Sequence, residues 1–162
     1  MRYKSSYLLF VTFTVTVWGC VYAWGSDSSV SSESEIKTFL NQFLQSYAKK
    51  DISGLMDMIA SDGDVVFFDT ATDARFVGKQ SIQEAYQTDF EQIKSFSGEF
   101  TWLSIKSKGE VAWFSTEMLI KADTGQVKFK RSGFWTGVLE KRQNRWQLIM
   151  SHFSFGRIDP IN

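Results

Sequence analysis

Apolar residues in the first half of the chain recur at the three- and four-residue spacing of helices. The longest stripe consists of Ile36, Phe39, Leu40, Phe43, Leu44 and Tyr47. This spacing predicts an amphipathic helix over residues 36–47. Shorter stripes predict a second helix over residues 52–59, with Asp51 or Ser53 as its N-cap, and a third over residues 79–93.

The pattern changes to a period of two in the second half of the chain, which is typical of half-buried strands. Polar or glycine-containing turns separate four such segments, which cover residues 99–105, 111–121, 127–141 and 145–155. Two shorter apolar runs, at residues 65–68 and 75–77, predict short strands between the second and third helices. Because helices and strands are segregated along the chain, we expect an α+β fold with a curved antiparallel (mixed) sheet wrapped around a helix layer.

The first 25 residues predict a targeting segment. Arg2 and Lys4 precede an apolar run, and residues 21–23 match a cleavage site with small residues. Three interpretations stay open: a cleaved signal peptide, a lipoprotein signal with a lipid on Cys20, or an uncleaved anchor of the ~20 residues that span a bilayer. We therefore expect a secreted or periplasmic bacterial protein that touches a membrane only through such an anchor or lipid.

Residues 26–33 are rich in serine and predict a flexible tether between the targeting segment and the folded domain. Ser32 followed by Glu35 matches a capping box at the start of the first helix. One domain is therefore expected over residues 34–158, a length that can bury a core without disulfides or a metal.

The composition excludes several classes of protein. The 18 basic and 18 acidic residues cancel, which argues against a nucleic-acid partner. The chain has one cysteine, Cys20, so cleavage after Ala23 would leave neither disulfides nor a thiol nucleophile. One histidine without a cysteine or carboxylate cluster is poor evidence for a metal, and we predict none. A glycine-rich phosphate loop and the Gly-x-Ser-x-Gly motif of hydrolases are also absent from the sequence.

The order of elements, together with several local motifs, resembles the SnoaL-like, ketosteroid-isomerase-like branch of the nuclear transport factor 2-like superfamily. The motifs are DVVFFD, GKQSIQEAY, VAWFSTE and the ending GFWTGVLEKRQNRWQLIMSHFSF. The resemblance covers about residues 35–155. It implies a cone-shaped sheet wrapped around three helices, an internal pocket and a homodimer. It also implies a small, largely apolar ligand and no cofactor, but it does not specify the reaction.

The resemblance places Asp69 where ketosteroid isomerases carry their general base, at the end of the first strand. The tyrosine that stabilises the oxyanion in those enzymes aligns with Phe43 and not with Tyr47. Residues 133–136, where their protonated aspartate falls, contain no acid. Because such donors usually supply the largest catalytic contribution, steroid isomerisation is not expected. An Asx-type turn cap is the structural alternative for Asp69.

His152 is the second candidate catalytic residue. It lies in step with Leu148 and Met150 on the last strand, and it matches a pocket-facing histidine of many SnoaL-like proteins. A neutral imidazole there could act as an acid, a base or a hydrogen-bond donor. The structural alternative is a core histidine that is bonded to a neighbour.

The strand pattern also suggests residues that bind the ligand. Glu117 shares a strand face with Trp113, and Arg131 on the next strand could pair with Glu117 or hold a ligand carboxylate. Trp135 and Tyr86 are further candidates for the pocket wall. The alternatives are an ion pair at the sheet rim, ordinary core positions, or a dimer surface rich in tryptophan.

Two functions remain open from the sequence. The first is an exported pocket protein that binds a small, largely apolar molecule, with cofactor-free acid–base chemistry of the isomerase or dehydratase type if it is an enzyme. The second is a non-catalytic ligand-binding or dimerisation module of the cell envelope.

Overall fold

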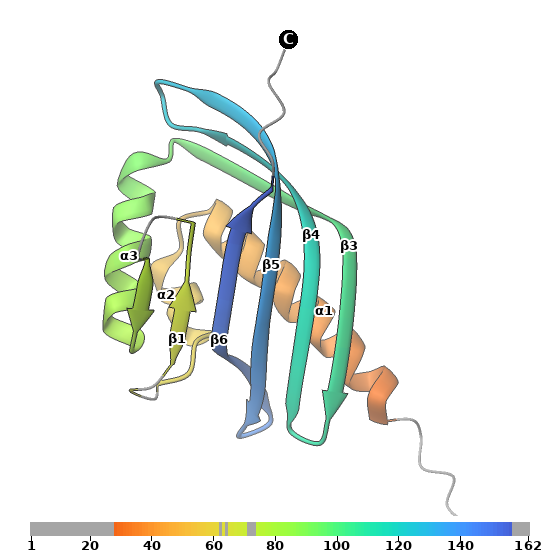
Figure 1. Cartoon of the computed structure of the whole chain (residues 1–162). Helices are drawn as coiled ribbons and strands as arrows, with labels where there is room; N and C mark the ends of the chain where they lie inside the picture. The colour runs from red at the N-terminus through yellow and green to blue at the C-terminus, as the bar shows by residue number, and fades with distance from the viewer. Residues whose placement is uncertain (1–27, 62, 64, 71–73, 157–162) are drawn as a thin grey trace, which may run out of the picture.

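The computed structural model of the chain describes residues 28–61, 63, 65–70 and 74–156 (Figure 1). Two helices come first, α1 (Ser28–Ala48) and α2 (Ile52–Asp57). The short strands β1 (Val66–Phe68) and β2 (Arg75–Val77) lead into α3 (Lys79–Gln92). Four longer strands follow: β3 (Ser95–Lys108), β4 (Val111–Asp123), β5 (Lys128–Arg142) and β6 (Arg145–Phe155).

The strands form one six-stranded sheet in the order β2-β1-β6-β5-β4-β3. β1 runs parallel to β6, and every other neighbouring pair is antiparallel. The sheet is therefore mixed, and it curves without closing, with α1 crossing behind it (Figure 1). The predicted α+β fold with a curved sheet is confirmed. Within the described part of the chain, α1 and α2 alone precede the sheet, because α3 follows the β1–β2 hairpin.

The first helix begins earlier than the sequence pattern suggested. α1 starts at Ser28, within the range expected to be a tether, so the Ser32–Glu35 pair lies inside the helix. Glu35 accepts hydrogen bonds from Lys141 Nζ and Trp146 Nε1, each at 2.8 Å. This contact joins α1 to the β5–β6 hairpin.

The predicted targeting segment, including Cys20, lies outside the described residues. Within the described part of the chain, none of the helices combines the length and the apolar character that crossing a bilayer requires. The predicted cap of α2 is present, because the Asp51 side chain accepts a hydrogen bond from Gly54 N at 2.9 Å.

An extra residue in β6 reverses which side chains face the helices. Leu139 pairs with Leu148 and Val138 pairs with Met150, so Ile149 is a β-bulge opposite β5. Trp146 and Leu148, before the bulge, are buried against the helices. After the bulge the inward positions are Ser151, Phe153 and Phe155. A second irregularity, between Phe100 and Trp102, occurs in β3.

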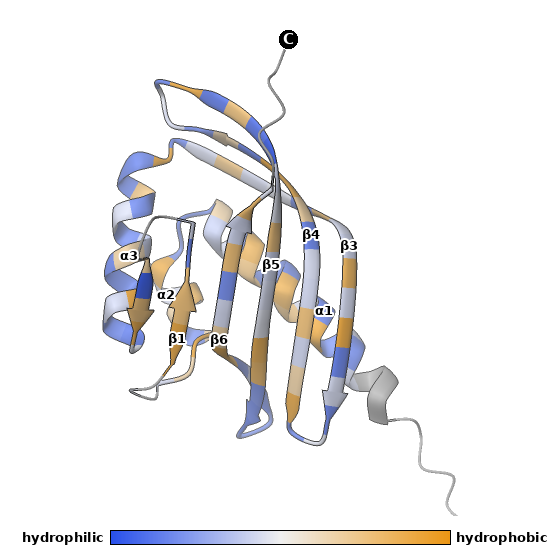
Figure 2. Ribbon diagram, in the orientation of Figure 1, coloured by the Kyte–Doolittle hydropathy of each residue, from blue (hydrophilic) through white to orange (hydrophobic). Residues whose placement is uncertain are grey.

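The core lies between the concave face of the sheet and the helices. α1 contributes Ile36, Phe39, Leu40 and Phe43, and α2 contributes Leu55 and Met56. The inward side chains of the sheet include Phe114, Leu139 and Leu148, which are almost completely buried. The hydropathy colouring shows apolar and polar residues alternating along the long strands, as expected for a sheet with one covered face (Figure 2).

Gly137 on β5 provides a test of this packing. A Cβ atom there would lie 2.7 Å from Phe114 Cε1 and 2.8 Å from the Met150 carbonyl oxygen. We expect Gly137→Ala to lower the free energy of unfolding by about 1–3 kcal/mol, because the site has no room for a methyl group. Urea unfolding measures the change. The exposed Ser97→Ala on β3 is the control and should cost less than about 0.5 kcal/mol; equal values for the two variants would contradict the packing.

Candidate functional site

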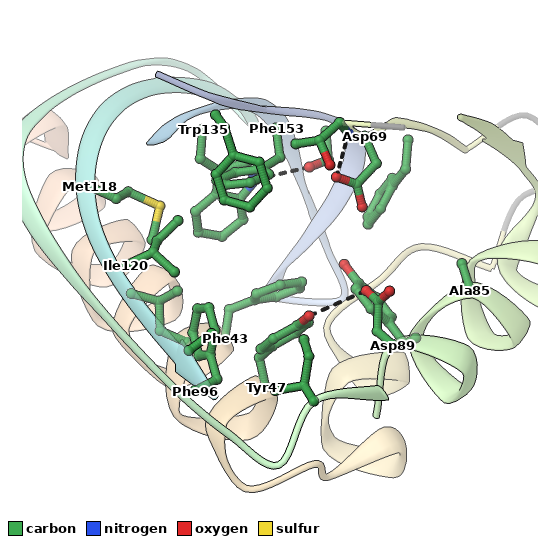
Figure 3. A pocket seen from close by; sticks show the side chains of 18 of the residues that line it. Phe43, Tyr47, Asp69, Ala85, Asp89, Phe96, Met118, Ile120, Trp135 and Phe153 are labelled. Carbon is green, nitrogen blue, oxygen red and sulfur yellow. Dashed lines mark hydrogen bonds between the residues drawn. The ribbon is translucent and has the colours of Figure 1, made fainter. Parts of the chain in front are cut away.

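A partly enclosed cavity of about 260 Å³ lies between α1, α3 and the concave face of the sheet (Figure 3). This volume is slightly below the roughly 300–1,000 Å³ that ligand pockets usually have. Eleven of the 22 described residues that line it are aromatic, and most of the others are aliphatic. The cavity therefore suits a small molecule with a large apolar part.

Trp135 forms a fixed wall of the cavity. Its ring packs against Phe43 at 5.1 Å and against Phe114 at 4.8 Å between ring centroids. Its indole Nε1 donates a hydrogen bond of 2.8 Å to Ser151 Oγ. Because Ser151 faces inward only after the bulge at Ile149, the bulge also supplies the hydrogen-bond acceptor that orients this ring.

A hydrogen-bonded tyrosine–carboxyl pair provides polar atoms in the cavity. The Tyr47 hydroxyl donates to Asp89 Oδ2 at 3.2 Å, which joins α1 to α3 (Figure 3). The Tyr47 ring is held by Phe96 and Phe90, at centroid distances of 4.6 and 5.1 Å. These ring contacts fix the hydroxyl in position.

Asp69 follows β1 and lies at the exposed rim of the cavity. Its Oδ1 accepts a hydrogen bond from Thr70 N at 2.6 Å, and its backbone N donates to the Ala74 carbonyl at 3.0 Å. These bonds form a local turn that holds the carboxylate. In Figure 3, Asp69 and Asp89 lie at one side of the cavity, and Met118 and Ile120 lie at the other.

The surroundings of the two acids differ. Burial raises the pKa of Asp89, and the negative charge of Asp69 raises it further, while the hydrogen bond from Tyr47 acts in the opposite direction. Burial also raises the pKa values of Tyr47 and Tyr86, so both phenols are neutral at ordinary pH. The cavity thus has an exposed acid at its rim and a more buried acid, Asp89, whose pKa is raised. Such a difference in environment can separate an acid from a base.

Several residues predicted from the sequence line the cavity. Asp69, Tyr86 and Trp135 are among its lining residues. Tyr86 packs edge-on against Tyr47 at 5.8 Å and against Phe43 at 6.3 Å between centroids. Among the described residues, the Tyr86 hydroxyl has no hydrogen-bond partner.

Trp113 and Glu117 lie outside the cavity, on the opposite face of the sheet. They pair with Val138 and Phe134 of β5, and both side chains are exposed. The inward face of β4 instead consists of Ala112, Phe114, Thr116, Met118, Ile120 and Ala122. The expected position of Trp113 and Glu117 in the pocket is therefore wrong, because the alternation was assigned to the wrong side of the sheet.

Arg131 lies on the inward face of β5, opposite Ile120, so it cannot pair with Glu117 on the outward face. Its guanidinium carbon lies 5.1 Å from the centroid of Phe129 and 5.3 Å from that of Phe155. These two rings line the cavity, and Arg131 is held against them without itself lining the cavity. The expected Glu117–Arg131 ion pair is wrong.

His152 lies on the outward face of the sheet and is exposed. Its ring meets Phe68 edge-on at 6.2 Å, in a shallow hollow that also contains Arg75 and Met150. The expected pocket position assumed unbroken alternation from Leu148, and the bulge at Ile149 breaks it. The placement of His152 in the pocket is therefore wrong.

Asp89 and the hydroxyl of Tyr47 are pocket groups that sequence reasoning missed. Asp89 lies three residues after Tyr86 and therefore near it on the surface of α3. An acid at that position, next to the apolar stripe of the helix, is the sequence feature that could have indicated a polar group in the pocket. No group of three or more potential metal ligands occurs within the part of the chain that the structure describes.

Comparison with known proteins identifies a family for most of the chain. A family model described as the SnoaL-like domain matches residues 36–157. No curated protein matches the sequence significantly.

Solved structures are similar in fold to this chain. A nuclear transport factor 2-like superfamily protein from Salmonella enterica serovar Typhimurium is 17% identical with a TM-score of 0.73, covering 82% of this chain and 96% of that one. A candidate dehydratase of the same superfamily from Streptomyces avermitilis is 14% identical with a TM-score of 0.72, covering 80% and 99%. A protein of unknown function from Pseudomonas putida is 22% identical with a TM-score of 0.69, covering 78% and 87%. At these identities the similarity shows the fold alone.

The raised pKa of Asp89 predicts a pH dependence of stability. The folded state keeps the Asp89 carboxyl group protonated at pH values above its ordinary pKa of 3.8. The contribution of Asp89 to the free energy of unfolding is therefore fully present below pH 3.8 and is lost as pH rises through the raised pKa. We expect Asp89→Asn to raise the thermal midpoint at pH 7, and we expect the difference from wild type to shrink below pH 3.8. Thermal unfolding at the two pH values measures this. The exposed Asp57→Asn is the matched control and should behave like wild type at both; an equal change in both variants would contradict the assignment.

Proposed function

The chain belongs to the SnoaL-like domain family, and from that premise we propose that it binds a small, largely apolar molecule in the cavity on the concave side of its sheet. The observation that supports this most directly is the cavity itself, in which aromatic walls surround a few polar groups. This combination is the usual character of small-molecule sites. The fixed position of Trp135 means that the wall is already formed before the ligand arrives.

We further propose cofactor-free proton transfer of the isomerase or dehydratase type, with Asp69 as the general base. Its position at the rim allows it to accept a proton from a ligand carbon and return it to a second carbon of the same molecule. In this arrangement Asp89 and Tyr47 bind the polar end of the ligand, and His152, on the outward face, takes no part. One similar structure carries the name of a candidate dehydratase, which agrees with this class of reaction.

A second function, a non-catalytic dimerisation module, has its own support on the outward face. Trp102, Trp113 and Phe134 are 52%, 46% and 45% exposed there, and Phe68 is also exposed. Exposed aromatic residues gathered on one sheet face are typical of an interaction surface. We propose that this surface joins two copies of the chain.

Export is also part of the proposal. The basic start, the apolar run and the cleavage site of the first 25 residues support it. A mature chain that begins after Ala23 and a chain that is lipidated on Cys20 differ in mass, so intact mass separates these two forms.

Native mass spectrometry of the protein purified from its own host tests binding and dimerisation together. We expect the mass of a dimer of the processed chain carrying a small molecule. Trp113→Lys should convert the dimer to monomer, because it introduces a charge into the apolar surface, while the ligand stays bound. A dimer without ligand would favour the non-catalytic module, and a monomer in the wild type would contradict the proposed interface.

Once that molecule is identified, two substitutions separate binding from chemistry. Ala85 lines the cavity (Figure 3), and Ala85→Trp should abolish binding by filling the space. Asp69→Asn should retain binding within about threefold and lower kcat by a factor of about 10²–10⁴, the usual contribution of a general base. His152→Ala is the control and should keep wild-type turnover. Unchanged turnover in Asp69→Asn would contradict the proposed base.

A further inference from the structure

We propose that the ligand of this cavity carries a positive charge, as an apolar amine or quaternary ammonium compound whose cationic end lies between Asp69 and Asp89. This inference rests on the proposed function, because it names the chemical class of ligand for the same cavity. It follows from the distribution of charge and aromatic rings in the wall.

The acids in the cavity have no basic partner. The described residues that line it include two carboxyl groups but no lysine, arginine or histidine. Within the part of the chain that the structure describes, neither Asp69 nor Asp89 forms an ion pair. Two acids close together in an apolar site are unfavourable unless a proton or a cation compensates them. A ligand with a positive charge would provide that compensation.

Several basic side chains lie near the cavity without neutralising its acids. Arg75 and His152 share the outward hollow with Asp69 but form no ion pair with it within the described residues. Arg131 is held on the rings of Phe129 and Phe155. The Lys50 ammonium donates to the Phe90 carbonyl at 2.8 Å, on the backbone of α3. Neither is therefore placed to neutralise the two acids.

The aromatic wall also favours a cation. Ring faces attract ammonium and guanidinium groups, and several rings around one site strengthen that attraction. Arg131 already demonstrates this chemistry, because two lining rings, Phe129 and Phe155, hold its guanidinium at 5.1 and 5.3 Å. Tyr47, Phe67, Phe76 and Tyr86 provide further rings in the lining shared with Asp69 and Asp89.

The polar atoms of the cavity can adapt to such a ligand. The Tyr86 hydroxyl lacks a partner among the described residues, so its oxygen is available to accept a hydrogen bond from an ammonium group. The Tyr47 hydroxyl already donates to Asp89, and that bond becomes stronger when the carboxyl group loses its proton. An anionic ligand would face the same two acids and be repelled.

A pair of probes of equal shape tests the inference. Trimethylphenylammonium and tert-butylbenzene differ in one atom, nitrogen or carbon, and therefore in charge. We expect the wild-type protein to bind both, with chemical shift changes at cavity residues. The preference for the cation, expressed as the ratio of the two dissociation constants, should fall by about tenfold or more in the double variant Asp69→Asn and Asp89→Asn. Asp57→Asn on the exposed side of α2 should leave the ratio unchanged.

A pH series adds a second readout. The groups that face Asp89 are Tyr47 from α1, Tyr86 from α3 and Asp69 after β1, while the Lys50 ammonium donates to the Phe90 carbonyl. Because a cation favours the ionised carboxyl group, its binding should release a proton and should weaken as pH falls through the pKa of Asp89. Affinity for tert-butylbenzene should not follow this trend.

The outcomes separate this inference from the proposed function. Binding of the neutral probe alone, or the same ratio of dissociation constants in wild type and double variant, would overturn the proposal of a cationic ligand. The proposal of an apolar binding pocket would still hold in that case. Binding of neither probe would overturn both. If Ala85→Trp binds neither probe, both probes occupy the cavity. If Ala85→Trp still binds them, the charge preference does not belong to this cavity and the inference is overturned.

Discussion

The arrangement of the pocket depends on one extra residue in the last strand. The bulge at Ile149 shifts the alternation of β6 after Leu148, so that Ser151, Phe153 and Phe155 face the helices while His152 faces outward. Without the bulge the imidazole would enter the cavity, and Trp135 would lose the hydroxyl that its indole contacts. Bulges commonly re-aim side chains next to functional sites, and this one determines the inner wall of the pocket.

The rest of the site comes from elements that meet only in three dimensions. α1 provides Tyr47, α3 provides Asp89, and the turn after β1 provides Asp69. The core between α1, α2 and the sheet is closely packed, whereas the space between α1, α3 and β4–β6 is left open. The same sheet thus provides a solid support on one part of its concave face and a cavity on another.

Much of the fold could be predicted from the sequence, because periodicity reflects local structure. The stripe from Ile36 to Tyr47, the β2 strand and the Asp51 cap of α2 all correspond to observed features. Alternation along β4 correctly separated its two faces. The face that contains Trp113 was wrongly predicted to line the pocket, although the opposite face, with Phe114 and Ile120, is more consistently apolar. The bulge in β6 could not be read from one strand, because it is defined by the register with its partner. Asp89 was missed because an acid on an amphipathic helix usually faces solvent.

Two acids without a basic partner among the described residues dominate the charge of the apolar cavity. Charged thiol reagents measure this directly. In a chain with Cys20→Ser, a cysteine is introduced at Ala85 inside the cavity or at Ser97 on exposed β3, and each is modified with methanethiosulfonate reagents that carry either a trimethylammonium or a sulfonate group. Relative to position 97, we expect position 85 to prefer the cationic reagent by about tenfold or more. Equal rates for the two reagents at position 85, or a preference for the anionic one, would contradict it.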